Sequence, residues 1–90
     1  MTAAPVRVLV VDDSAFMRAV IRRVLERAGR FEVVGEARDG REAVDAAARV
    51  RPDVITMDVN MPVMGGVEAV QQIMRERPVP VVMLSAHTTE

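Results

Sequence analysis

The sequence lacks cysteine, lysine, tryptophan and tyrosine altogether, and it has only two phenylalanines among 90 residues. Without cysteine, the chain can form neither a disulfide nor a thiolate metal site, which fits a reducing compartment. Because aromatic side chains are few and the formal net charge is −1, the chain offers neither the basic surface nor the stacking platform that nucleic acids require. These absences exclude cysteine-based enzymes and zinc ribbons, and we expect no nucleic-acid partner.

Long hydrophobic segments are also missing. The longest unbroken apolar runs, such as residues 8–11, are far shorter than the roughly 18 residues of a membrane span and the roughly 7 to 15 apolar residues of a signal-peptide core. We therefore expect a cytoplasmic protein with no membrane contact. A length of 90 residues suffices for one small domain with a modest core.

What the sequence does contain is an alternation of short β-branched runs with amphipathic segments. Strands are expected at residues 6–11, 31–37, 54–57 and 79–84, where 31–37 suits a sheet edge and 79–84 a buried strand. Helices are expected in the intervening segments, where capping and stop residues flank the amphipathic stretches: Ser14 and Gly29, Asp39 and Pro52, and, after the third helix, Pro78. This order predicts an α/β protein with a parallel sheet, right-handed crossovers and helices on both faces.

Polar side chains stand where the first, third and fourth of these strands end. Asp12 and Asp13 follow the first strand, Asp58 follows the third, and Ser85 follows the fourth. Because ligands bind at the carboxyl ends of the strands in an open parallel sheet, we expect these side chains to converge on one edge. Three carboxylates in one cleft repel one another unless a hard cation neutralises them, and oxygen ligands favour Mg²⁺. The sequence therefore predicts a magnesium site.

The same residues indicate a chemistry for the site. A carboxylate can attack phosphorus and form an acyl phosphate, and Asp58 is the best candidate because it stands alone before a loop that contains Pro and Gly. The backbone carbonyl of Asn60 is near enough in sequence to complete the metal coordination, and Ser85 could donate a hydrogen bond to a phosphoryl oxygen. The alternative is that Asp12, Asp13 and Asp58 are solvated loop acids, which their joint placement with Ser85 disfavours.

Three stretches carry a resemblance to a known family: VLVVDDS at 8–14, PDVITMDVNMPVMGG at 52–66 and PVVMLSA at 80–86. Together they resemble the receiver domain of two-component response regulators, from about residue 6 to the end of the chain. Within this family, residues 14–21 and 66–88 are most similar to the N-terminal receivers of chemotaxis protein-glutamate methylesterases, and stand-alone chemotaxis receivers are near neighbours. The resemblance implies a flavodoxin-like (CheY-like) parallel sheet with the strand order 2-1-3-4.

The resemblance also implies a role for each candidate residue. Asp12, Asp13 and Asp58 would bind Mg²⁺, and the backbone carbonyl of Asn60 would complete the coordination. Asp58 would accept a phosphoryl group from a chemotaxis histidine kinase, and Ser85 would be the switch hydroxyl that moves towards the phosphate. The role of such a module is regulation and not turnover, so we expect no enzymatic activity from the 90 residues present.

The chain departs from the family after its fourth strand. The family has a fifth strand, followed by a lysine that contacts the phosphate, but this chain contains no lysine. We therefore expect residues 1–90 to be an incomplete receiver domain without a second domain. The fifth strand, the last two helices and the methylesterase domain that would link the receiver to chemoreceptors are then missing.

The missing elements would leave strand four as an exposed apolar edge and part of the first helix uncovered. Such surfaces favour homo-oligomerisation or domain swapping. The alternative function is thus that of a non-phosphorylated interaction or assembly fragment. A stand-alone chemotaxis receiver is a further alternative.

Overall fold

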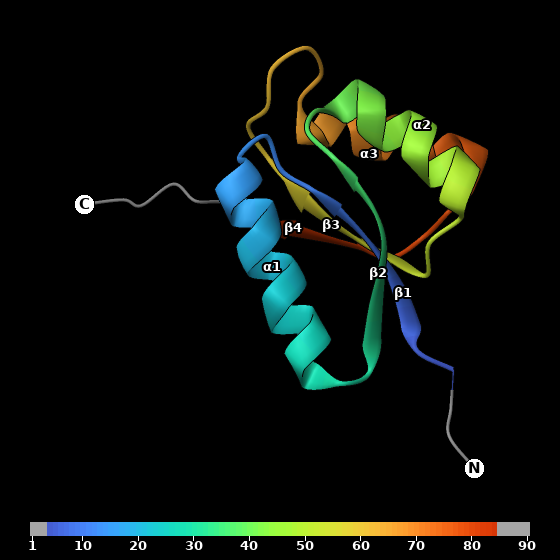
Figure 1. Cartoon of the computed structure of the whole chain (residues 1–90). Coiled ribbons are helices and arrows are strands. Elements are labelled where there is room, and N and C mark those ends of the chain that lie inside the picture. The colour runs from blue at the N-terminus through green and yellow to red at the C-terminus, as the bar shows by residue number, and fades with distance from the viewer. Residues whose placement is uncertain (1–3, 85–90) are drawn as a thin grey trace.

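The computed structural model describes residues 4–84, and its centre is a sheet of parallel strands (Figure 1). The strands are β1 (Val6–Val11), β2 (Phe31–Ala37), β3 (Val54–Asp58) and β4 (Val81–Leu84). They lie in the order β2-β1-β3-β4, which is the flavodoxin-like order that the resemblance implied. β4 begins later than expected because Pro80 has no N–H to donate to the strand ladder.

Three helices cover the sheet in the described part of the chain. Helix α1 (Ala15–Ala28) lies on one face, and α2 (Gly40–Val50) and α3 (Gly66–Glu76) lie together on the other (Figure 1). None of the helices in residues 4–84 is long and apolar enough to cross a membrane.

The helix ends follow from the capping residues that the sequence predicts. The Ser14 hydroxyl accepts a hydrogen bond from the backbone N–H of Met17 at 3.2 Å. Asp39 Oδ1 accepts one from the backbone N–H of Glu42 at 2.8 Å. Each cap satisfies a donor that has no partner inside the helix. Gly29 ends α1 with φ at 77°, a left-handed conformation that glycine adopts without strain.

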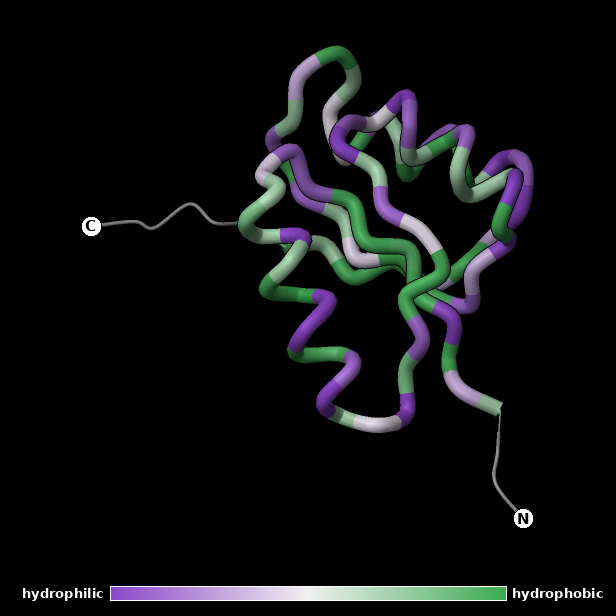
Figure 2. The backbone as a smooth tube through the Cα atoms, viewed as in Figure 1, coloured by the Kyte–Doolittle hydropathy of each residue, from purple (hydrophilic) through white to green (hydrophobic). Residues whose placement is uncertain are grey.

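The hydrophobic core lies between the sheet and the helices α2 and α3. Leu9, Ile55 and Met57 are completely buried and belong to this cluster, and Figure 2 shows the strands as hydrophobic segments at the centre of the molecule. The helices contribute mainly small side chains, so that they approach the strands closely: Ala43, Val44, Ala46, Ala47, Ala69 and Ile73. β1 and β3, the strands that end in the predicted site, are therefore firmly packed.

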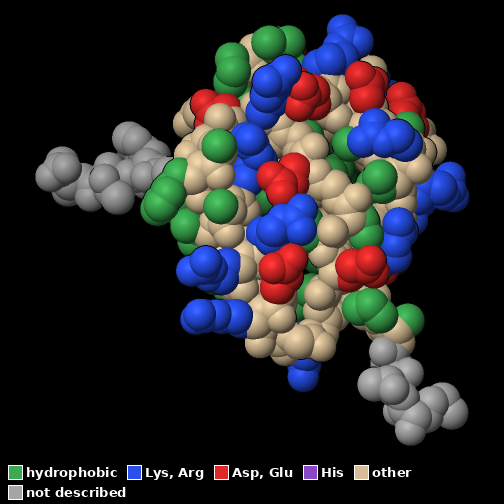
Figure 3. Space-filling model, viewed as in Figure 1, with side chains coloured by type: hydrophobic (Ala, Val, Ile, Leu, Met, Phe, Trp, Pro, Cys, Tyr) green, Lys and Arg blue, Asp and Glu red, His purple; other side chains and the backbone are tan. Residues whose placement is uncertain are grey.

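Helix α1 and the edge of the sheet at β4 are covered much less. No residue of α1 is buried, Phe16 is 73% exposed, and Figure 3 shows hydrophobic side chains at the surface over this helix. Val82, Met83 and Leu84 of β4 are exposed as well. The prediction of a buried strand at 79–84 is therefore wrong for these residues, because β4 is an edge strand and nothing in residues 4–84 covers it. The expected exposed edge and uncovered first helix are observed.

Candidate functional site

The carboxyl ends of β1 and β3 bring three aspartates together. The two strands are neighbours, with Val11 of β1 opposite Met57 of β3. Asp12 and Asp58, which directly follow these two residues, therefore meet at one edge of the sheet. One carboxylate oxygen each from Asp12, Asp13 and Asp58 lie within 4.8 Å of one another. Asp12 is buried, Asp58 is half-buried and Asp13 is exposed, so the cluster is open to solvent on the Asp13 side.

Asp12 is held at three points. Its backbone N–H donates to the carbonyl of Ala37 at 3.0 Å, and its Oδ1 accepts a hydrogen bond from the backbone N–H of Ser14 at 2.9 Å. Its carbonyl oxygen accepts a hydrogen bond from Arg18 Nη1 at 2.7 Å. These contacts fix both the backbone and the carboxylate of Asp12 at the end of β1.

Arg18 is the residue of this site that sequence reasoning missed. The arginines of the first helix are, by default, a solvated face, but the side chain of Arg18 is only 18% exposed. The available signal is its position, because Arg18 lies one turn after the N-cap Ser14, and its N–H donates to the Ser14 carbonyl at 3.0 Å. From that turn a long side chain reaches back to the end of the preceding strand.

The loop after β3 is tied to the rest of the fold by backbone hydrogen bonds. The N–H of Gly66 donates to the Val59 carbonyl at 3.0 Å, and the N–H of Gly40 donates to the Met64 carbonyl at 2.9 Å. A Cβ on Gly66 would collide with the carbonyl oxygen of Asp58, so only glycine allows α3 to start this close to the aspartate. Asn60 lies in this loop and is exposed.

The environment of Asp58 raises the pKa of its carboxyl above the ordinary value. Burial is the largest cause that raises the pKa of this carboxyl, and the charge of Asp12 raises it further. Asp13 adds to the rise, whereas hydrogen bonds from the backbone at Asn60 and Val59 oppose it. When all three aspartates are ionised, their carboxylates repel one another, and a bound cation would relieve this repulsion.

Asp12, Asp13 and Asp58 thus come together as the sequence predicts, and Asn60 lies in the adjoining loop. Ser85 lies outside the described residues. Leu84, the last described residue, pairs in register with Asp58. The arrangement offers oxygen ligands to a hard cation, and it leaves one side open for a further oxygen-bearing group.

Comparison with known proteins identifies the class to which this fold and site belong. A family model described as the response regulator receiver domain matches residues 8–90. The chain therefore belongs to the receiver domains of response regulators, and with them to two-component signalling.

Within this family, the chain is similar to the receiver part of chemotaxis methylesterases. It is 60% identical over 85 residues to the protein-glutamate methylesterase/protein-glutamine glutaminase of Geobacillus kaustophilus, a match that covers 94% of this chain and 24% of the relative. It is 52% identical over 90 residues to the protein of the same name from Pyrococcus abyssi, covering 100% of this chain and 24% of the relative. The chain thus spans about a quarter of the length of these relatives.

Solved structures give the same result. The crystal structure of the response regulator domain of Thermotoga maritima CheB matches with a TM-score of 0.90 and 50% identity, over 96% of this chain and 64% of that one. The CheX-CheY-BeF3-Mg²⁺ complex from Borrelia burgdorferi matches with a TM-score of 0.88 and 32% identity, over 97% of this chain and 66% of that one. The predicted fold and the predicted resemblance to CheB-like receivers are confirmed.

Proposed function

We propose that this chain is the phosphoacceptor receiver of a chemotaxis response regulator of the methylesterase type, and that Asp58 takes the phosphoryl group with Mg²⁺ bound. The observation that carries the proposal is the cluster of Asp12, Asp13 and Asp58, whose oxygens lie within 4.8 Å of one another at the strand ends. A related CheY has been solved in a complex with BeF3 and Mg²⁺, which supports the same ligands here.

The donor set suits Mg²⁺. All of the candidate ligands are oxygens, which Mg²⁺ prefers, and the positions that the protein leaves open on a bound Mg²⁺ take water and phosphate. The carboxylates of Asp12, Asp13 and Asp58 and the backbone carbonyl of Asn60 would hold the ion. When bound, the ion neutralises charge on the transferring phosphoryl oxygens.

The transfer itself is a displacement at phosphorus. A carboxylate oxygen of Asp58 forms the new O–P bond while the N–P bond of a phosphohistidine on a histidine kinase breaks, and the imidazole leaves with the electron pair of that bond. The packed strands β1 and β3 hold the carboxylate in position, which is the main contribution that a protein makes to this chemistry. We further propose that Ser85 is the switch hydroxyl, which donates a hydrogen bond to the acyl phosphate.

The function of the module is regulatory. We propose that residues 1–90 are an incomplete receiver domain that acts in the cytoplasm and controls a methylesterase domain like the one named in the relatives, and through it chemoreceptors. A second candidate, assembly without phosphorylation, is supported by the exposed apolar side chains of α1 and β4, with Phe16 at 73% and Val82 at 50% exposure. Size-exclusion chromatography with light scattering tests it, and a monomer that is stable on dilution contradicts it.

Amide NMR of the labelled chain, first with Mg²⁺ and then with added beryllofluoride, tests the phosphoacceptor proposal. We expect saturable shifts of the Asp13, Asp58 and Ser85 amides with each addition. Asp58→Ala should abolish the response to beryllofluoride. Asp45→Ala, which removes an exposed carboxylate on α2, is the matched control and should respond like the wild type. A folded wild-type chain that ignores both additions contradicts the proposal and favours assembly.

A further inference from the structure

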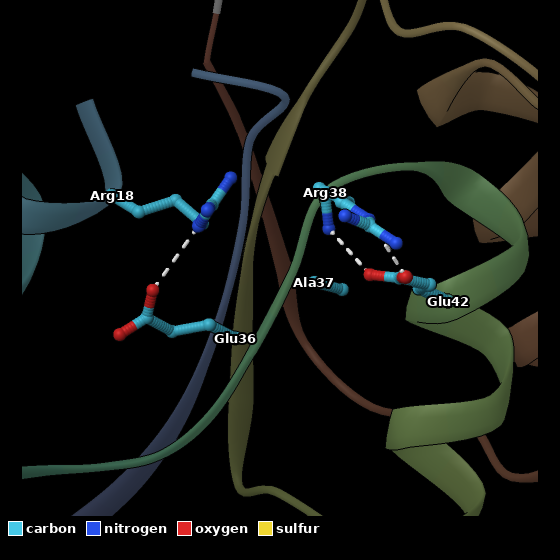
Figure 4. A pocket seen from close by; sticks show the side chains of 5 residues that line it. All are labelled: Arg18, Glu36, Ala37, Arg38 and Glu42. Atoms are coloured by element: carbon cyan, nitrogen blue, oxygen red, sulfur yellow. Dashed lines mark hydrogen bonds and ion pairs between the residues drawn. The ribbon is translucent and has the colours of Figure 1, made fainter. Parts of the chain in front are cut away.

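Arg18 joins the end of β1 to the edge strand β2. Its Nη1 donates to the carbonyl oxygen of Asp12 at 2.7 Å, and its Nε donates to Glu36 Oε1 at 3.1 Å. Figure 4 shows the Arg18 side chain reaching from α1 towards Glu36 on β2. Because the guanidinium is planar and its donors are fixed relative to one another, two such bonds together define where it lies.

Glu36 is itself fixed from a second side. Its Oε2 accepts a hydrogen bond from Arg22 Nε at 2.9 Å and lies 2.8 Å from Arg22 Nη2. The hydrogen bond from Arg22 is the largest cause that lowers the pKa of Glu36; burial opposes this, and the bond from Arg18 adds to it. The carboxylate therefore stays charged at neutral pH. We call Arg18, Glu36 and Arg22 the Arg18 clamp.

The Arg18 clamp lies beside a hollow whose charged side chains are paired with one another. Arg18 and Glu36 line a hollow of about 240 Å³ together with Ala37, Arg38 and Glu42. Arg38 is paired with Glu42 at 2.9 Å, as Figure 4 also shows. The two arginines and two glutamates around the hollow are thus paired with one another within the protein.

The clamp acts on the peptide group that joins Asp12 to Asp13. The carbonyl of Asp12 and the N–H of Asp13 belong to one rigid plane, so the bond from Arg18 sets the direction in which the chain leaves β1. The carboxylate of Asp12 has its own bond to the Ser14 amide. Asp13 is exposed, and its carboxylate has no hydrogen bond within the described residues. Of the clustered aspartates, Asp13 therefore depends most on the orientation of this peptide.

From these contacts we infer that Arg18 is a positioning residue for the metal site: by holding the Asp12–Asp13 peptide, it sets the affinity of the carboxylate cluster for Mg²⁺. The inference rests on the proposed function, because it requires that the cluster bind the ion. The expected change in Mg²⁺ affinity is opposite to the change expected from charge alone. Removal of a nearby positive charge should by itself strengthen the binding of a cation, whereas loss of positioning weakens it.

The test is a set of Mg²⁺ titrations of the chain and its variants, followed by amide NMR because the chain has no Trp or Tyr. Arg18→Gln should raise the Mg²⁺ dissociation constant about three- to tenfold. This is at or below the lower end of the roughly 10–100-fold losses seen when residues that support metal ligands are removed, because Arg18 contacts the backbone of Asp12 and not a ligand carboxylate. Arg18→Lys keeps the charge but not the planar fork and should weaken binding by a smaller factor. Arg23→Gln removes the same charge from an exposed position on the same helix and should leave the constant unchanged or slightly lower.

A purely structural role for Arg18 gives a different result. The unfolding temperature in EDTA would fall, while the dissociation constant of the folded protein would stay at the wild-type value. Equal or tighter binding by Arg18→Gln overturns the inference, and so does an equal effect of Arg23→Gln. If Arg18→Gln does not fold, wild-type affinity in Arg18→Lys overturns it. A folded wild-type chain that fails to bind Mg²⁺ overturns the proposed function and the inference together, whereas wild-type binding with unaffected variants overturns only the inference.

Discussion

Replacing Asp58 with asparagine should stabilise the metal-free protein, although it removes the proposed phosphoacceptor. The oxygens of the aspartate cluster lie within 4.8 Å of one another, and two unit charges at that separation repel by about 0.9 kcal/mol even at the dielectric constant of water. Asp58→Asn removes two of the three pairwise repulsions. The gross gain is about 1.7 kcal/mol, and weaker hydrogen bonds from the backbone at Asn60 and Val59 reduce it to about 1 kcal/mol.

The pH dependence follows from the raised pKa of Asp58. In the unfolded chain this carboxyl titrates near its ordinary value of 3.8. The folded state binds the proton of Asp58 more tightly, so the contribution of Asp58 to stability is most favourable below that value and is lost as the pH rises through the interval up to the folded-state pKa. Above this interval the repulsion is fully developed. The difference between Asp58→Asn and the wild type should therefore appear at neutral pH and shrink in acid.

Thermal unfolding followed by circular dichroism in EDTA and low salt is the appropriate assay. A gain of 1 kcal/mol corresponds to a rise of about 4–8 °C in a domain of this size, and added salt should reduce it. With Mg²⁺ the wild type should have the higher unfolding temperature, because the ion stabilises the protein that binds it more tightly and Asp58→Asn lacks one of the proposed ligand carboxylates. Asp45→Asn removes an exposed charge away from the cluster and should give no gain. An Asp58→Asn variant that melts at or below the wild-type temperature in EDTA refutes the electrostatic reasoning.

Three other substitutions test different parts of the fold. Gly66→Ala places a Cβ against the Asp58 carbonyl and should lower the unfolding free energy, measured by urea denaturation, by about 1–3 kcal/mol. Gly65→Ala is the control: its Cβ would have its nearest neighbour at 3.6 Å, and it should cost less than about 1 kcal/mol. Equal losses in the two variants would contradict the close approach of Gly66 to Asp58. Phe16→Ser should change the unfolding free energy by less than about 1 kcal/mol because the side chain is 73% exposed, and a loss of about 3–5 kcal/mol would mean that Phe16 is buried. If the second candidate function, assembly, holds, sedimentation velocity should detect less self-association of this variant than of the wild type. Glu36→Gln should cost about 0.2–1 kcal/mol at neutral pH. Since the pKa of Glu36 is lowered from 4.5, the stabilisation that Glu36 provides is present above that value and lost as the pH falls through the folded-state pKa. Urea titrations in which Glu36→Gln loses as much stability in acid as at neutral pH would contradict this prediction.

The sequence predicts those parts of the fold whose causes are local. Ser14, Asp39 and Gly29 mark helix ends because each solves a hydrogen-bonding or backbone problem within a few residues. The convergence of Asp12 and Asp58 could also be predicted, because parallel topology alone brings the carboxyl ends of strands to one edge. Both predictions need only the chain order and the period of the hydrophobic pattern.

The features that could not be predicted depend on partners distant in the sequence. Arg18 and Glu36 are 18 positions apart, and nothing in either local segment indicates that they meet. The β-branched pattern around Val82 predicts a buried strand, and the exposure of this residue is expected only from the family elements that would follow strand four, not from the local sequence. Periodicity assigns an element to a strand or helix, but it does not show which of its faces will be covered.

The two halves of the site are consequently held by different forces. Asp58 follows Met57, which is completely buried against α2 and α3, so close packing fixes the proposed nucleophile. Asp12 follows Val11, which is buried in the same core. Asp13, however, is exposed and leads into α1, a helix with no buried residue, and there the Arg18 clamp and backbone hydrogen bonds replace packing. Ion pairs at partly exposed positions weaken with salt much more than buried apolar contacts do. We therefore expect that rising ionic strength loosens the Asp13 side of the site before it affects Asp58, and amide exchange rates of the two residues at low and high salt would measure this difference.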